Sequence, residues 1–178
     1  MPTIPANPAG HALRFLILTA ARPGEVAGAQ WSEIDLEARV WTVPAGRMKG
    51  RVEHRIPLSD PAVAILKTMA SVPRNEFVFS GQQGGALPSD AMAKMLRRTK
   101  RTDGQRHGFR SAFAQWAAER TNYFRVREMA LAHKIGSNVE RTYHRRDLFD
   151  RRRRLMDDWA RFCAQPATGD VVPLRARR

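Results

Sequence analysis

The chain has 178 residues, 43% of them hydrophobic, which is enough for one domain with a substantial core. Its 31 basic and 17 acidic residues give a formal net charge of +14, and all but five of the basic residues are arginines. A GC-rich genome would explain the preference for arginine but not the excess of positive charge, so we expect a polyanionic partner, with nucleic acid the best fit. The single cysteine, Cys163, excludes an internal disulfide and a CxxC metal site. The longest apolar run is too short to span a membrane, so we expect a cytoplasmic protein.

Local signals in the first third of the chain predict two helices and a β-hairpin. Residues 1–10 are rich in proline and small residues and indicate a disordered lead-in. Residues 11–21 are apolar nearly all round, which is typical of a buried helix, and Pro23 favours the first turn of a second helix. Two β-type runs, "ARVWTVP" and "EHRIPLS", flank the segment "AGRMKGRV", and together they predict a hairpin.

The rest of the chain is predicted to be mainly helical. Capping residues and helical spacing predict helices at about 60–69 and 90–98, within 101–120, and at about 126–132, 138–143 and 148–163. Residues 77–79, "FVF", indicate a short third strand or an extended piece. In the last helix an apolar stripe is expected to face the core and the arginines to face elsewhere, and residues 164–178 are expected to be a disordered tail. The prediction is an α+β fold, mainly α, with a small antiparallel sheet of about three strands, in one domain spanning residues 11–163.

Two tyrosines are candidates for chemistry on phosphate. Tyr143 lies among Arg141, Arg145 and Arg146, whereas Tyr123 lies in "RTNYFRVREM". A phenol has a pKa of about 10, so it attacks phosphorus only where cations hold the phosphate and a base or the local field removes its proton. Without such a site, either tyrosine is a packed or surface aromatic.

Other side chains have both a functional and a structural interpretation. His107 and Arg110 would share one face of a helix, and they are either a phosphate-binding pair or a surface histidine with an arginine at the edge of the core. Glu25 lies one turn after Arg22, and it either orients that arginine for a phosphate or forms a plain structural ion pair with it.

The last two candidates are also ambiguous when taken alone. His133 ends the apolar stretch 129–132, where a histidine is usually structural. Lys49 lies near the tip of the predicted hairpin, where a lysine is usually solvated but can also donate a proton to a leaving oxygen.

Taken in order, these residues resemble the catalytic domain of the tyrosine recombinase family, and most closely the phage-type integrases of prophages and genomic islands. The resemblance covers residues 11–163. The matching stretches are "LILTAARPGEV", "WSEIDL", "VWTVPAGRMKGRVEHRIPLS", "HGFRSAFAQWAAERT", "MALAHKIG" and "VERTYHRRDLFDRRRRLMDDWA".

The resemblance implies a role for each candidate residue. Tyr143 would attack the scissile phosphodiester, form a 3′-phosphotyrosyl bond and free a 5′-hydroxyl. The implied supporting roles are phosphate clamping by Arg22 and Arg110, a phosphate hydrogen bond from His133, general acid catalysis by Lys49, general base or proton relay by His107, and support of Arg22 by Glu25. We expect further DNA contacts from basic residues around the site, namely Arg47, Arg51, Arg106, Arg141, Arg145 and Arg146.

The implied partners are double-stranded DNA and, on DNA, other recombinase protomers. No metal or nucleotide cofactor is expected, because the arginines supply the positive charge. No membrane or small-molecule substrate is expected either. Related integrases carry an N-terminal DNA-clamping domain, and here only a short proline-rich segment precedes the first helix. The alternative is therefore a truncated, catalytically idle DNA-binding remnant or regulator. A basic structural or ribosome-associated protein would explain the charge but not the ordered set of residues.

Overall fold

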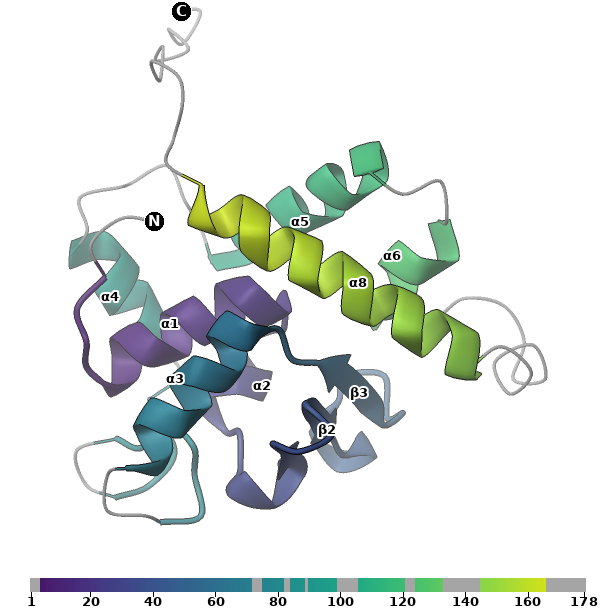
Figure 1. The fold of residues 1–178 in the computed structure, drawn as a ribbon. Coiled ribbons are helices and arrows are strands. Elements are labelled where there is room, and N and C mark those ends of the chain that lie inside the picture. Colours follow the sequence, from purple (N-terminus) through teal and green to yellow (C-terminus); the bar gives the residue numbers. More distant parts are fainter. Residues whose placement is uncertain are drawn as a thin grey trace, which may run out of the picture.

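The computed structural model describes residues 4–71, 75–81, 84–88, 90–98, 106–120, 124–132 and 145–165, with only the backbone described at residues 106, 107 and 145–147. The helices in these ranges are α1 (Pro8–Thr19), α2 (Pro23–Ala27), α3 (Asp60–Ala70), α4 (Ala91–Arg98), α5 (Arg106–Arg120), α6 (Phe124–Ala130) and α8 (Arg145–Ala164) (Figure 1). The strands are β1 (Ile34–Asp35), β2 (Val40–Val43) and β3 (His54–Pro57). The predicted fold class, mainly helical with a small antiparallel sheet, is confirmed.

The first helix begins earlier than the sequence predicted. The Asn7 side chain accepts a hydrogen bond of 2.9 Å from the Gly10 backbone N–H, and Pro8 follows directly at the start of α1. Ile4 is also packed in the core, with 3% of its surface exposed. The prediction of a disordered lead-in is therefore wrong for residues 4–10, because an Asn cap and a proline in the first turn start the helix before the apolar run.

The predicted hairpin is confirmed by β2 and β3, which pair antiparallel from Val40 opposite Pro57 to Val43 opposite His54. The third strand is β1, which pairs with β2 on its other edge. The prediction that residues 77–79 form that strand is wrong, because Phe77 makes only an isolated bridge with Gln30. Val78 and Phe79 lie in bends between that bridge and a second isolated bridge, from Ser80 to Ala86.

The remaining helices lie close to their predicted positions. Residues predicted as helices at 60–69, 90–98, 126–132 and 148–163 correspond to α3, α4, α6 and α8, with bounds that differ by at most three residues. The helix predicted within 101–120 corresponds to α5. The predicted helix at 138–143 lies outside the described residues, as does the predicted tail beyond residue 165. No described helix has both the length and the apolar composition needed to cross a membrane.

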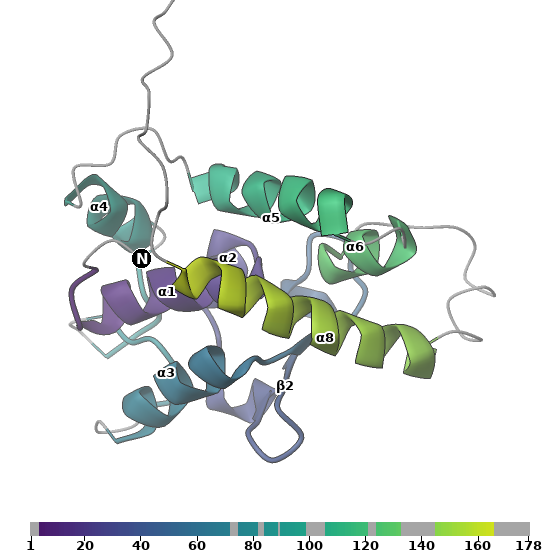
Figure 2. The same ribbon diagram turned by 45° about the horizontal axis from the view of Figure 1, so that its top comes forward.

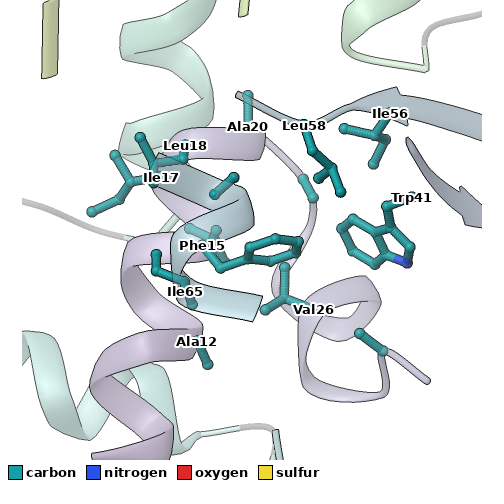
Figure 3. Close-up of a cluster of buried hydrophobic side chains, with 14 of the residues drawn as sticks. Ala12, Phe15, Ile17, Leu18, Ala20, Val26, Trp41, Ile56, Leu58 and Ile65 are labelled. Atoms are coloured by element: carbon teal, nitrogen blue, oxygen red, sulfur yellow. The ribbon is translucent and has the colours of Figure 1, made fainter. Parts of the chain in front are cut away.

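The core forms where α8 crosses α1. Both helices lie between α5 on one side and α3 with the sheet on the other (Figures 1 and 2). The Trp159 Nε1–H of α8 donates a 2.7 Å hydrogen bond to the Ile17 carbonyl of α1. On the sheet side, Phe15 points toward Trp41 and Val26, with the Phe15 and Trp41 ring centroids 5.3 Å apart (Figure 3). The one core therefore joins the first helix, the sheet and the last helix.

Candidate nucleic-acid site

Arg22 lies at the start of α2 and is held by Glu25. The Glu25 carboxylate accepts hydrogen bonds of 2.8 Å from both the Arg22 backbone N–H and the Arg22 Nη1. The Glu25 side chain is 5% exposed and that of Arg22 is 29% exposed. The buried carboxylate thus fixes the arginine, while part of the guanidinium stays open to solvent.

Arg110 is fixed next to Arg22 by backbone carbonyls. Its Nη1 donates a 2.7 Å hydrogen bond to the Ala20 carbonyl at the end of α1, and its Nη2 donates to the Leu131 carbonyl. Burial and the neighbouring Arg22 lower the pKa of Arg110 to about 10, partly offset by Glu25 and Glu128. Arg110 is therefore cationic at neutral pH, and the fold brings it beside Arg22.

The sequence analysis did not identify His54, the first residue of β3, as part of this region. Burial, with smaller contributions from the nearby charges of Arg152, Arg110 and Arg22, lowers the pKa of His54 to about 3, against the opposing effect of a hydrogen bond to the Ala130 backbone. The imidazole is therefore neutral at pH 7. Strand alternation provided a signal, because His54 shares a strand face with the buried Ile56.

Arg152 of α8 corrects the expectation that the arginines of the last helix face away from the core. Arg152 is 6% exposed, its Nη1 lies 3.4 Å from the Met129 carbonyl, and its guanidinium lies 5.0 Å from the Phe149 ring centroid. Burial and the nearby Arg55 lower its pKa to about 10. Helical spacing provided the signal that was missed, since residues 149, 152 and 156 share one face.

Three basic side chains thus meet the C-terminal end of α6. Arg152, His54 and Arg110 approach the backbone at residues 129, 130 and 131 respectively. The carbonyl groups at a helix C-terminus carry a partial negative charge, which favours donors from neighbouring elements. Elements that are far apart in sequence are joined at this point.

The loop between β2 and β3 carries three of the predicted site residues. Lys49 and Arg51 are exposed, and Arg51 has a positive φ of 50°. Arg47 instead forms an ion pair with Glu33 and donates a hydrogen bond to the Glu25 carbonyl. This placement favours a structural role for Arg47 over the predicted DNA contact.

Several predicted site residues are described in part or not at all. His133, Tyr143 and Arg141 lie outside the described residues. Arg106 and His107 lie in the first turn of α5, and Arg145 and Arg146 begin α8, in each case with only the backbone described. The structure therefore brings together Arg22, Glu25 and Arg110 and leaves the remaining roles as predictions. Among the described residues, no group of three or more His, Cys, Asp or Glu is placed to hold a metal ion.

Comparisons with known proteins show what this chain resembles in sequence and in fold. The sequence matches the model of the phage integrase family over residues 8–148. Prophage integrase IntA of Escherichia coli (strain K12) is 35% identical over 160 residues, which cover 88% of this chain and 39% of that protein. The integrase from mycobacterium phage Brujita has a similar fold, with a TM-score of 0.70 at 21% identity over 96% of this chain and 56% of that chain. A lambda integrase (75-356) dimer bound to a COC′ core site matches with a TM-score of 0.56 at 19% identity, over 72% of this chain and 50% of that one.

Proposed function

The chain belongs to the phage integrase family, and we propose that it cleaves and rejoins DNA strands in site-specific recombination. In the proposed reaction the Tyr143 oxygen attacks a phosphodiester, the bond from phosphorus to the 5′ oxygen breaks, and a 3′-phosphotyrosyl link forms. A second 5′-hydroxyl then attacks that link and releases Tyr143. The chain spans 39% of the length of the IntA relative, so the activity of this chain is part of the proposal.

The arrangement of Arg22 and Arg110 carries this proposal. The two residues are far apart in sequence, yet both are fixed beside the C-terminal end of α1, Arg22 by Glu25 and Arg110 by two carbonyls. Two oriented guanidinium groups can hold the non-bridging oxygens of one phosphate and stabilise the charge that develops on them. Lys49 would protonate the departing 5′ oxygen, and His107 would accept the proton of Tyr143. In the same scheme His133 donates a hydrogen bond to the phosphate.

Double-stranded DNA is the proposed partner. The formal net charge of +14 favours phosphate contacts, for which we propose Arg51, Arg106, Arg141, Arg145 and Arg146. The similar lambda integrase was solved as a dimer on a core site, which supports DNA and further protomers as partners here. Affinity should fall steeply as salt rises, because each neutralised phosphate releases counterions.

A covalent adduct on nicked DNA tests the proposal. A pool of duplexes with random sequence around a single nick traps any phosphotyrosyl product, because the short strand with the new 5′-hydroxyl diffuses away. We expect a protein–DNA adduct that resists denaturation on a gel, and sequencing of the trapped DNA would give the preferred site. Tyr143→Phe should abolish the adduct and leave DNA affinity nearly unchanged, whereas Tyr123→Phe should retain the adduct.

The same assay separates the alternative function, a DNA-binding remnant without chemistry. DNA binding without an adduct, on every nicked duplex and at low salt, would support the remnant. An adduct lost only with Tyr123→Phe would instead show that the wrong tyrosine was chosen.

A further inference from the structure

A buried ion pair lies at the base of the β2–β3 loop. The Glu33 side chain is 5% exposed, and the Arg47 Nη1 contacts both of its carboxylate oxygens. The same carboxylate accepts a 2.9 Å hydrogen bond from the Nε1–H of Trp41 and a 3.3 Å bond from the Gln30 backbone N–H. Trp41 is itself fully buried. Glu33 is therefore held rigidly by the sheet, and it holds Arg47.

The other end of the Arg47 guanidinium reaches α2. Its Nη2 donates to the backbone carbonyl of Glu25, the residue whose carboxylate holds Arg22. The guanidinium also packs closely over the end of α2, because a Cβ placed on Gly28 would lie 3.2 Å from the Arg47 Nη2. One arginine thus connects the β2–β3 loop to the helix that begins beside Arg22.

Lys49 follows this anchor almost directly. Met48, between Arg47 and Lys49, is 5% exposed and anchors the loop in the core. The Arg51 backbone N–H then donates a 3.0 Å hydrogen bond to the Met48 carbonyl across the turn that presents the exposed Lys49. A lysine on a free loop would sample many positions, whereas this one leaves the body of the protein at a fixed point.

We infer that Arg47 is a positioning residue whose ion pair with Glu33 and hydrogen bond to Glu25 fix the Lys49 loop relative to Arg22. This inference rests on the proposed function, because it assigns Arg47 to the step in which Lys49 protonates the leaving oxygen. A buried ion pair adds little stability compared with apolar packing of the same volume. What the pair provides instead is a fixed position for Arg47 relative to Glu33. Arg47 acts through Lys49 and does not touch the DNA.

Arg47→Lys is the informative variant, and Arg39→Lys is its matched control. A lysine keeps the charge opposite Glu33 but cannot contact Glu33 and the Glu25 carbonyl at once, as the planar guanidinium does. Arg39, directly before β2, forms an exposed ion pair of 2.6 Å with Asp60 outside the proposed site. Both variants should fold, which circular dichroism and thermal unfolding would establish.

The first measurement compares two leaving groups at the site identified from the trapped adduct. A 5′-bridging phosphorothiolate leaves as a thiolate without protonation, so it makes the general acid dispensable. We expect Arg47→Lys to slow cleavage of the ordinary phosphodiester by about tenfold or more, a part of the roughly 10²–10⁴-fold that general acid catalysis contributes. On the phosphorothiolate its rate should return to that of the unmodified protein, as for Lys49→Ala, while Arg39→Lys should match the unmodified protein on both substrates.

The outcomes separate this inference from the proposed function. If Lys49→Ala is rescued but Arg47→Lys is equally slow on both substrates, or is not slowed at all, the positioning role is overturned and the proposed function stands. If Lys49→Ala is not rescued, Lys49 is not the acid, and both the role of Lys49 and this inference fail.

The second measurement does not depend on catalysis. Trypsin cuts after Lys49 and Arg51 only when the loop opens enough to enter the protease, so the initial rate reports loop opening. We expect Arg47→Lys to raise that rate about tenfold, with Arg39→Lys unchanged. Equal rates for the two variants would overturn the inference even if the chain forms no adduct.

Discussion

Three arginines in and beside the candidate site, Arg22, Arg47 and Arg110, are held in different ways. In the N-terminal half, Arg22 and Arg47 are each paired with a buried carboxylate, Glu25 and Glu33 respectively. In the C-terminal half, Arg110 donates to backbone carbonyls. A carboxylate neutralises a guanidinium, whereas a carbonyl dipole orients it and leaves its charge in place.

This difference decides which of these arginines keep their charge without a paired carboxylate. Arg110 and Arg152 lie close to backbone carbonyls and have pKa values lowered to about 10 by burial, so they remain cationic at neutral pH. Arg22 is paired with the Glu25 carboxylate, but its side chain is 29% exposed, so part of its guanidinium stays accessible. A group that must bind phosphate is best oriented without being neutralised, and Arg110 meets that condition.

The largest expected effect comes from removing either arginine of the proposed phosphate site. Arg22→Ala or Arg110→Ala should reduce strand cleavage by at least ~10³-fold, as loss of an arginine that stabilises a transferring phosphoryl group does. Arg110→Lys should not restore activity, because a lysine cannot reproduce the fixed fork that reaches two carbonyls. Single-turnover cleavage of the trapped site measures this, and near-normal cleavage by Arg110→Lys would contradict the clamp role.

The next effect concerns the free energy of unfolding and the ion pair between Arg47 and Glu33. Glu33→Gln leaves the largely buried Arg47 without its counter-charge, and we expect a loss of about 3 kcal/mol in the free energy of unfolding. Asp60→Asn, which breaks the exposed pair with Arg39, should cost less than about 1 kcal/mol. Urea denaturation of both variants tests this, and equal losses would show that burial of the pair is unimportant.

His54 makes the contact between β3 and the end of α6 sensitive to acid. The folded protein holds His54 with a pKa of about 3, below the ordinary value of 6.5. The stabilisation from its neutral form is complete above pH 6.5 and is lost as pH falls from 6.5 toward 3, reaching about 2 kcal/mol lost at pH 5. His54→Asn should remove this part of the pH dependence of unfolding. A His54 imidazole that titrates near pH 6.5 by NMR would refute the burial of its charge.

The smallest effect is expected at Arg152. Arg152→Met removes a buried charge and keeps much of the packing, so the free energy of unfolding should change by less than about 1 kcal/mol. The pKa of His54 should rise, because Arg152 is the charge that depresses it most. NMR titration of His54 in the variant measures this, and an unchanged pKa would place Arg152 too far away to matter.

The sequence predicted those features whose signals are local. The β2–β3 hairpin and α5 follow from β-type runs and helical spacing, and the motif order identified Arg22 and Arg110. The strand β1 is only two residues long, too short for an alternation pattern to reveal it. The extent of α1 was missed because proline-rich composition outweighed the Asn7 cap.

Contacts between distant residues explain what the sequence analysis did not identify in the site. Arg47 looked like one more basic residue on a loop, and its partner Glu33 lies 14 residues earlier, on a different element. His54 becomes part of the arginine region only through its approach to Ala130. Such partners depend on how the elements pack, which neither composition nor spacing specifies.

The hydrogen bond between Trp159 and Ile17 has a consequence for synthesis in the cell, because it joins residues 142 positions apart. At roughly 5–20 residues per second, a ribosome needs about 7–30 s to make the intervening chain. Throughout that time the face of α1 that α8 covers has no partner, and its apolar side chains are open to chaperones or to other nascent chains. Folding of this domain is therefore completed only after its last helix has emerged.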